Sequence, residues 1–90
     1  MWYAYILKSQ KNGRLYIGST DNLKRRVLEH NSGIGGRYSS YNRPYKVIFY
    51  EAYIEKSDAM RAEKFFKSGY GREVLKNDKL KSYFEKEKML

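Results

Sequence analysis

The sequence contains no cysteine, so neither disulfides nor thiolate metal sites can form, and the hydrophobic core alone must hold the fold. The longest apolar runs, such as residues 47–50, are far shorter than the roughly 20 residues of a membrane span. There is one histidine and no glycine-rich phosphate loop before a helix, which argues against acyl-transfer triads and common nucleotide-binding loops. The N-terminus lacks the basic start and cleavage site of a signal peptide, so we expect a cytoplasmic protein.

Positive charge is the most informative part of the composition. Nineteen Lys and Arg residues against ten Asp and Glu residues give a net charge of +9 in 90 residues, a length that fits a single domain spanning residues 1–90. Such a surface attracts polyphosphate, although charged helix faces are common in any soluble protein. Ten tyrosines are present, and we expect most of them to pack in the core.

Alternating and apolar segments predict three strands. Residues 2–7 form the first, with Trp2, Ala4 and Ile6 on one face and the tyrosines on the other. The turn signal Asn12-Gly13 leads to a second short strand at 14–18, which completes a hairpin. Residues 45–54 are apolar nearly throughout and predict a strand that is buried on both faces.

Helical spacing predicts the remaining elements. A first helix begins at Thr20 or Asp21 and ends near residue 31, and a second covers 57–68. Gly69 and Gly71 bracket a turn, and a third helix over 72–88 is interrupted near Asn77. The order β-β-α-β-α-α predicts an α+β domain, in which helices flank a small three-stranded antiparallel sheet.

Arg26 and His30 are the first candidate site residues. They lie four apart on the first helix, so their side chains point about 40° apart and can meet. Arg26 borders the inner face marked by Leu23 and Val27, whereas Arg25 points farther out. A guanidinium beside a neutral imidazole can neutralise phosphate charge. Spacing alone favours the commoner alternative, an isolated surface arginine beside a partly exposed histidine.

Glu63 is the second candidate. It lies at the edge of a buried helix face, with Lys64 and Lys67 expected to point away, and that face is marked by Ala59, Ala62 and Phe66. A carboxylate beside an apolar face needs a partner. Mg²⁺ accepts sites with one or two carboxylates, and a salt bridge to a lysine would also serve, so the pattern leaves both alternatives open.

The hairpin tyrosines Tyr3, Tyr5 and Tyr16 are the third candidates. A phenol is a poor base in water, but a nearby metal or arginine can favour its ionised form. The far commoner alternative is that strand tyrosines simply pack.

The order of these residues is more specific than any one of them. Tyr3-Ala4-Tyr5 is followed by Tyr16-Ile17-Gly18 and then by Arg26, His30 and Glu63. This arrangement resembles the GIY-YIG nuclease superfamily, and closely the small stand-alone bacterial members. The resemblance covers residues 2 to about 75 and is most specific in the run 15–33, LYIGSTDNLKRRVLEHNSG.

The resemblance implies a metal-dependent endonuclease that hydrolyses phosphodiester bonds in DNA, with RNA also open, in repair or recombination. It makes Tyr5 and Tyr16 the motif tyrosines, Arg26 the catalytic arginine, His30 the helix histidine and Glu63 the ligand of Mg²⁺ or Mn²⁺. One carboxylate suits a one-metal site better than a two-metal site.

Two departures from the family pattern bear on this assignment. The first motif reads Tyr-Ala-Tyr instead of Gly-Ile-Tyr, which keeps the final tyrosine, and Asn77 is only a weak match to the family's asparagine. We expect the positions with phosphate contacts to be Lys24, Arg25, Arg37 and Arg43, the last two following a glycine-rich loop. Specificity would come from loops or a protein partner. A non-catalytic nucleic-acid-binding module and a subunit that is idle without a partner are the alternatives.

Overall fold

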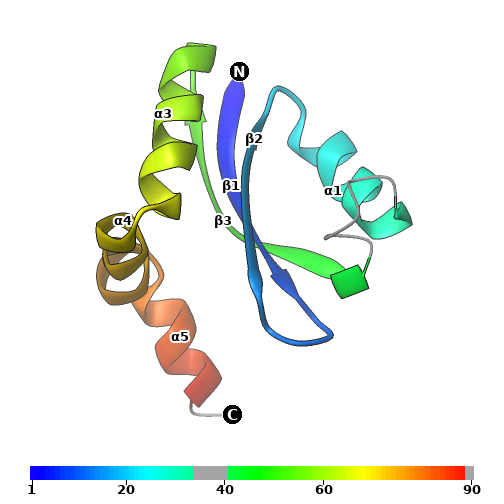
Figure 1. The fold of residues 1–90 in the computed structure, drawn as a ribbon, viewed down its shortest axis with the longest axis vertical. Helices are drawn as coiled ribbons and strands as arrows, with labels where there is room; N and C mark the ends of the chain where they lie inside the picture. The colour runs from blue at the N-terminus through cyan, green and yellow to red at the C-terminus, as the bar shows by residue number, and fades with distance from the viewer. Residues whose placement is uncertain (34–40, 89–90) are drawn as a thin grey trace.

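A three-stranded antiparallel sheet forms the centre of the computed structural model, which describes residues 1–33 and 41–88. The strands are β1 (Trp2–Ser9), β2 (Leu15–Thr20) and β3 (Tyr45–Tyr53), in the order β2-β1-β3. Helix α1 (Leu23–Ser32) covers one face, as Figure 1 shows. The helices on the other side are α3 (Lys56–Lys67), α4 (Gly69–Val74), the π-helical turn η1 (Leu75–Lys79) and α5 (Lys81–Lys88). This is the predicted α+β class.

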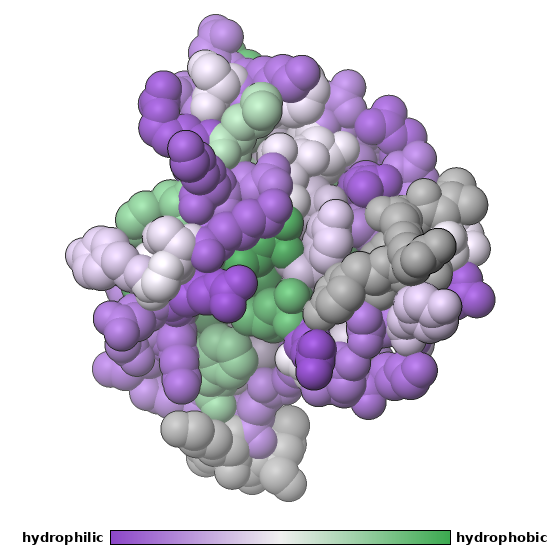
Figure 2. All heavy atoms as spheres, viewed as in Figure 1, coloured by the Kyte–Doolittle hydropathy of each residue, from purple (hydrophilic) through white to green (hydrophobic). Residues whose placement is uncertain are grey.

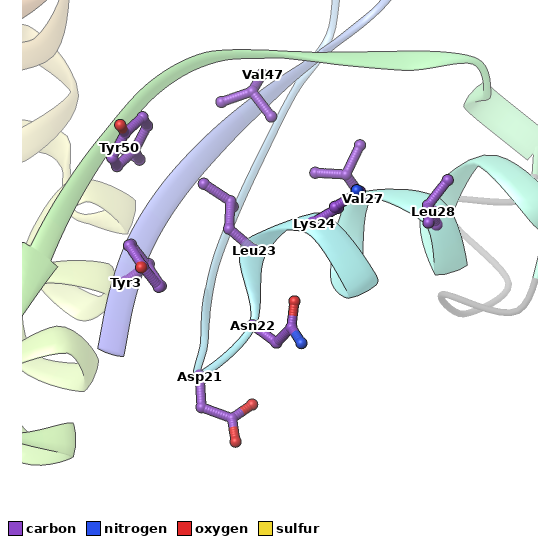
Figure 3. A pocket seen from close by; sticks show the side chains of 9 residues that line it. All are labelled: Tyr3, Asp21, Asn22, Leu23, Lys24, Val27, Leu28, Val47 and Tyr50. Carbon is purple, nitrogen blue, oxygen red and sulfur yellow. The ribbon is translucent and has the colours of Figure 1, made fainter. Parts of the chain in front are cut away.

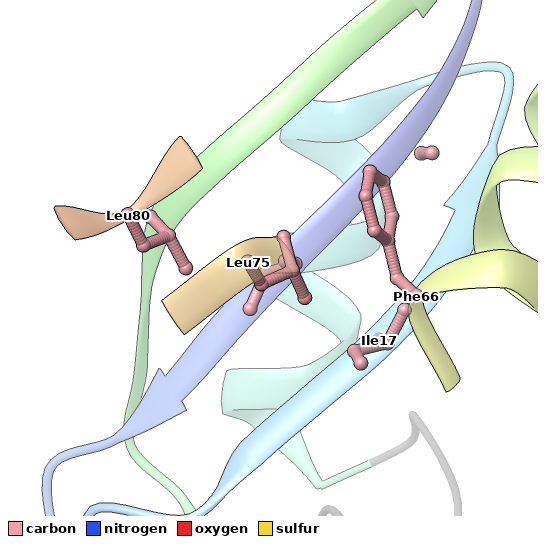
Figure 4. Packing of buried hydrophobic residues seen from close by; sticks show 6 residues of the cluster. Ile17, Phe66, Leu75 and Leu80 are labelled. Atoms are coloured by element: carbon pink, nitrogen blue, oxygen red, sulfur yellow. The ribbon is translucent and has the colours of Figure 1, made fainter. Parts of the chain in front are cut away.

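Each face of the sheet carries its own hydrophobic cluster. Side chains alternate between faces along a strand, so Ala4 and Ile6 point toward α3, and Tyr5 and Leu7 point toward α1. On the α3 side, Figure 4 shows Ile17 and Phe66 near one another, with side chains from the C-terminal segment, Leu75 and Leu80, completing the cluster. On the α1 side the partners are Tyr16, Leu23, Val27, Tyr45 and Val47. The central strand β1 therefore supplies both clusters.

The prediction that the third strand is buried on both faces is wrong. Strand β3 is an edge strand, and Tyr50 within it is 55% exposed. The strand buried on both faces is the central strand β1, because its alternate side chains belong to the two hydrophobic clusters on opposite faces of the sheet. The apolar run therefore predicted a strand correctly, but it predicted a central position for a strand that lies at the edge of the sheet. Aromatic residues are also exposed on edge strands, so their presence does not show that a strand is central.

The helix boundaries also differ from those predicted. Asn22 caps α1 by accepting a hydrogen bond from the Arg25 backbone, whereas Thr20 still belongs to β2. Helix α3 begins at Lys56 without a side-chain cap. Gly69 and Gly71, which were predicted to bracket a turn, lie inside α4, and Ser68 caps that helix. The predicted interruption near Asn77 is the π-helical turn η1. No helix within the described residues is long and apolar enough to span a membrane.

Gly18 fixes how closely the first two strands approach at the α1 face. It pairs with Tyr5 in the antiparallel register, and the Tyr5 ring lies over it. A Cβ at this position would lie 2.6 Å from the Tyr5 hydroxyl oxygen and 2.7 Å from Cζ, distances that no relaxed structure tolerates. Because Tyr5 is only 1% exposed, its ring has little room to withdraw.

We therefore predict that Gly18→Ala lowers the free energy of unfolding by about 1–3 kcal/mol, the usual cost of overpacking a core. Gly69→Ala is the matched control, because a Cβ at that position would meet nothing within 4 Å and the residue begins a helix. Urea unfolding of both variants measures the difference. Equal stabilities would show that the Tyr5 ring can move aside.

Candidate active site

A buried hydrogen bond joins the sheet to α1 at the centre of the candidate site. The Tyr5 hydroxyl and His30 Nε2 are 3.2 Å apart, and His30 is fully buried. Within the described part of the chain, His30 Nδ1 has no hydrogen-bond partner. The bond fixes the position of both side chains, which come from residues 25 positions apart in the sequence.

Aromatic rings enclose His30. The ring centroids of Tyr16 and His30 are 4.5 Å apart in an edge-to-face arrangement, and Tyr45 approaches the imidazole at 5.9 Å. Tyr5 and Tyr16 stack at 6.5 Å. Tyr16 is less deeply buried than Tyr5, so its phenol is the nearer of the two to solvent. The two motif tyrosines and the helix histidine thus form one packed group.

Arg26 lies on the shoulder of α1 that faces this group. Its side chain is 28% exposed, against 54% for Arg25, as the helical spacing predicts. The Arg26 guanidinium lies 3.3 Å from Glu29 Oε1 and also engages Tyr5 through a side-chain hydrogen bond. Arg25 pairs with Asp21 at 2.9 Å on the outer side of the helix, and its Nε lies 4.0 Å from Glu29 Oε1.

Burial controls the ionisation of the two central side chains. It raises the pKa of Tyr5 to about 12, although the hydrogen bond from Arg26 acts in the opposite direction. Burial also lowers the pKa of His30 to about 4, and the positive charge of Arg26 adds to this effect. At neutral pH the site therefore presents an un-ionised phenol and a neutral imidazole beside a permanent cation.

Glu63 approaches from the other side of the sheet. Its Oε1 accepts a hydrogen bond of 2.6 Å from the Ser19 hydroxyl on the edge strand β2, and Lys67 Nζ lies 2.7 Å from its Oε2. Ser19 is next to Gly18, where the sheet carries no side chain. The negative charge of Glu63 contributes to raising the pKa of Tyr5, so the carboxylate lies within electrostatic reach of the aromatic group.

Glu63 has the lysine partner that the sequence pattern left open beside Mg²⁺. Lys67 is exposed and points away from the buried helix face as expected, and it forms an ion pair with Glu63 because residues four apart on a helix are neighbours. The described residues contain no group of three or more metal-ligating side chains. Glu63 alone suits a hydrated Mg²⁺, which binds through one or two carboxylates and substrate phosphate. The exposed pair with Lys67 contributes little, about 0.3–0.5 kcal/mol, and a divalent ion could displace it.

The residues expected to contact phosphate do not all lie beside this group. Lys24 lies on the opposite shoulder of α1 and lines an open hollow of about 650 Å³ between α1 and β3, shown in Figure 3 with Leu23, Tyr50 and Val47. Arg43 is exposed, and its guanidinium approaches Gly33, at the C-terminal end of α1. Arg37 and most of the glycine-rich loop fall outside the described residues.

Two residues at the site were missed by the sequence reasoning. Ser19 orients Glu63, and Tyr45 packs against His30, and no sequence signal marks either of them. The four-residue spacing of Glu63 and Lys67 could have identified the lysine of the salt bridge that was left open. Asn77, the weak match, is exposed in η1 and lines a hollow made by C-terminal residues.

The fold and this group of side chains define a class of small α+β nuclease domains. The sequence model described as "GIY-YIG catalytic domain" matches residues 1–86, nearly the whole chain. The chain belongs to the GIY-YIG family, whose members are generally endonucleases, and a nuclease-type function follows from membership.

Several small bacterial proteins are similar to the chain along most of its length. The UPF0213 protein SAG0778 of Streptococcus agalactiae is 43% identical over 65 residues, covering 72% of this chain and 73% of that protein. The "UPF0213 protein in ldhD 5'region" of Pediococcus acidilactici is 43% identical, covering 83% and 78%. The solution NMR structure of the UPF0213 protein BH0048 from Bacillus halodurans is 35% identical, with a TM-score of 0.50 and coverage of 83% and 82%. These relatives support a stand-alone bacterial GIY-YIG protein.

The environment of His30 generates a prediction about pH. The pKa of histidine in an unfolded chain is near 6.5, whereas that of buried His30 is lowered to about 4. The unfolded chain therefore binds a proton more readily. The free energy of unfolding has its full value above about pH 6.5 and falls as the pH drops toward about 4. We expect the ring nitrogens of His30 to keep neutral chemical shifts at pH 5.5 in ¹⁵N NMR of the native protein. Half-protonation near pH 6.5 in the folded state would contradict the buried arrangement.

Proposed function

We propose that the protein is a divalent-metal-dependent endonuclease that hydrolyses phosphodiester bonds in DNA, in repair or recombination. One observation carries the proposal: the Tyr5 ring, which is hydrogen-bonded to His30, lies over Gly18, and the next residue of β2, Ser19, holds the Glu63 carboxylate. The arginine of α1, which engages Tyr5, and the glutamate of α3 are thereby held near the same part of β2, an arrangement that an isolated surface arginine and a purely structural glutamate would not require. The net charge of +9 supports a polyphosphate substrate.

Each side chain has a role that its surroundings favour. Arg26 stabilises negative charge that develops on the phosphoryl oxygens, since a preoriented donor acts strongly where water is scarce. Tyr16, the more accessible phenol, orients the attacking water. Tyr5 is a positioning residue, because a buried phenol with a pKa of about 12 stays protonated at neutral pH and so provides no phenolate to act as a base. His30, held neutral, keeps Tyr5 and Tyr16 in place.

Glu63 is the residue that would hold Mg²⁺ or Mn²⁺, with Ser19 fixing the orientation of its carboxylate. A bound divalent ion supplies charge neutralisation at the phosphate oxygens. The cytoplasmic location and a protein partner that confers specificity stay predictions.

The first test is incubation with Mg²⁺ against a panel of duplex, branched and single-stranded DNA, with RNA in parallel. We predict that Glu63→Ala abolishes cleavage and leaves DNA affinity nearly unchanged, because the carboxylate serves the metal and only repels phosphate. Glu73→Ala, which removes an exposed carboxylate from α4, is the control. Full activity of Glu63→Ala in both Mg²⁺ and Mn²⁺ would remove Glu63 from the site.

The comparison of Arg26 with Arg25 separates an enzyme from a non-catalytic binding module. The two residues carry the same charge, but only Arg26 engages Tyr5. We predict that Arg26→Ala slows single-turnover cleavage by about 10²-fold or more, the usual loss of one transition-state donor, and that Arg26→Lys also fails.

Arg25→Ala should mainly weaken binding, because Arg25 lies on the outer side of α1 and pairs with Asp21. Enzyme in excess over substrate separates the chemical step from affinity. Equal cleavage rates for the Arg25 and Arg26 variants would favour the binding-module alternative. Cleavage that appears only with a cell extract would instead favour a subunit that needs a partner.

A further inference from the structure

A hollow on the α3 side of the sheet combines an apolar floor with a rim of positive charge. It measures about 410 Å³, within the range of small-molecule sites, and lies between β2 and the C-terminal segment. Ile17, Leu75 and Phe84 supply apolar surface, and Arg14, Arg72 and Lys76 supply cations. Figure 2 shows the corresponding green patch over β2 and α5, bordered by hydrophilic side chains.

The charges at this hollow are uncompensated within the part of the chain that the structure describes. No acidic residue lines it, and none of the three cations forms a salt bridge with a described residue. Acidic side chains occur in the neighbouring segment, such as Glu73, but they do not border the hollow. A ligand that carries negative charge and a flat apolar group therefore matches the lining. A neutral apolar ligand would bury the cations without a partner of opposite charge.

The position of the hollow relates it to the candidate active site. Ile17 in its lining and Ser19, which binds Glu63, are alternate residues of β2 on the same face. Alternate residues of a strand lie about 7 Å apart, a distance that is close to the spacing of successive phosphates in an extended strand. Phe84 brings an aromatic ring to the hollow, and rings of this kind stack on unpaired bases.

We propose that this hollow holds one unpaired nucleotide of the substrate, with its base against Phe84 and its phosphate on the cations of the rim. The inference rests on the proposed function, and it narrows the substrate to DNA with an unpaired or splayed nucleotide beside the cleaved bond. An acidic peptide could satisfy the cations but gains nothing from Phe84 beyond apolar contact, and so the two occupants differ in their need for a base.

The test is binding without metal, so that no cleavage takes place. A labelled oligothymidylate of about eight nucleotides is compared by anisotropy with an abasic oligomer of the same length, which keeps the phosphates and lacks the bases. We expect the native protein to prefer the oligothymidylate by about tenfold. Phe84→Leu retains apolar packing but removes the aromatic face, and it should lose most of this preference while leaving abasic binding unchanged.

Two further variants and two controls make the comparison specific. Arg72→Ala and Lys76→Ala should weaken both oligomers by a similar factor, about threefold or more each, because they act on phosphate. Tyr70→Leu removes an exposed ring and Lys64→Ala removes an exposed cation, neither of which lines the hollow, and neither variant should change the preference for bases.

Several results would overturn the proposal. These are equal binding of the two oligomers by the native protein, a full preference in Phe84→Leu, or displacement of oligothymidylate by polyglutamate at equal charge concentration. If Phe84→Leu does not fold, methyl NMR of the native protein decides: oligothymidylate must shift the Ile17 and Leu75 methyls, and the abasic oligomer must not.

The nuclease proposal can fail separately from this one. Base-dependent binding without any metal-dependent cleavage would remove the nuclease function and leave the nucleotide site in place. If the native protein cleaves DNA and the Phe84→Leu variant binds and cuts DNA normally, the nuclease function stands and the nucleotide site is ruled out.

Discussion

The buried contact of Tyr5 with His30 and Gly18 is the constraint on which the candidate site depends. Tyr5 stands on the central strand, crosses over the bare backbone of Gly18 on β2, and meets His30 on α1. A side chain at position 18 would displace the ring, and the ring in turn limits where α1 can sit. Tyr16 then packs on both, and Arg26, one helical turn before His30, reaches the same hydroxyl. The geometry of one phenol thus orders three elements of the fold.

Strand β2 brings together residues from both sides of the sheet because it is an edge strand. Tyr16 and Gly18 face α1, whereas Ile17 and Ser19 face α3, as alternation along a strand requires. In a central strand these two faces would be separated by neighbouring strands on both sides. At an open edge only one residue, Gly18, intervenes without a side chain, so a substrate running along the edge can meet the cation of one face and the carboxylate of the other.

The sequence predicted the fold class well because periodicity and turn residues are local signals. The hairpin, the faces of the first strand and the inner stripe of α1 all follow from spacing within a few residues. The edge position of β3 depended on which strands pair, and a segment's own composition does not encode that choice. Ser19 and Tyr45 were missed for the same reason: their importance lies in contacts with Glu63 and His30, which are distant in sequence. The catalytic roles of the motif residues stay predictions until activity is measured.

The charged residues of the proposed site differ in sign from one end of β2 to the other. Arg26 lies on α1, Glu63 lies across the β2 edge, and the cations Arg14, Arg72 and Lys76 line the hollow between the beginning of β2 and the C-terminal segment. A strand of nucleic acid held by the last group would present its next phosphate near Glu63, where repulsion from the carboxylate must be offset. Lys67 offsets the negative charge in the free protein through a weak, exposed ion pair. A divalent ion carries twice the charge of the lysine and can also bind phosphate oxygens. If such an ion took the place of the Lys67 ammonium beside Glu63, the carboxylate would no longer repel the substrate and would help to hold it through the ion.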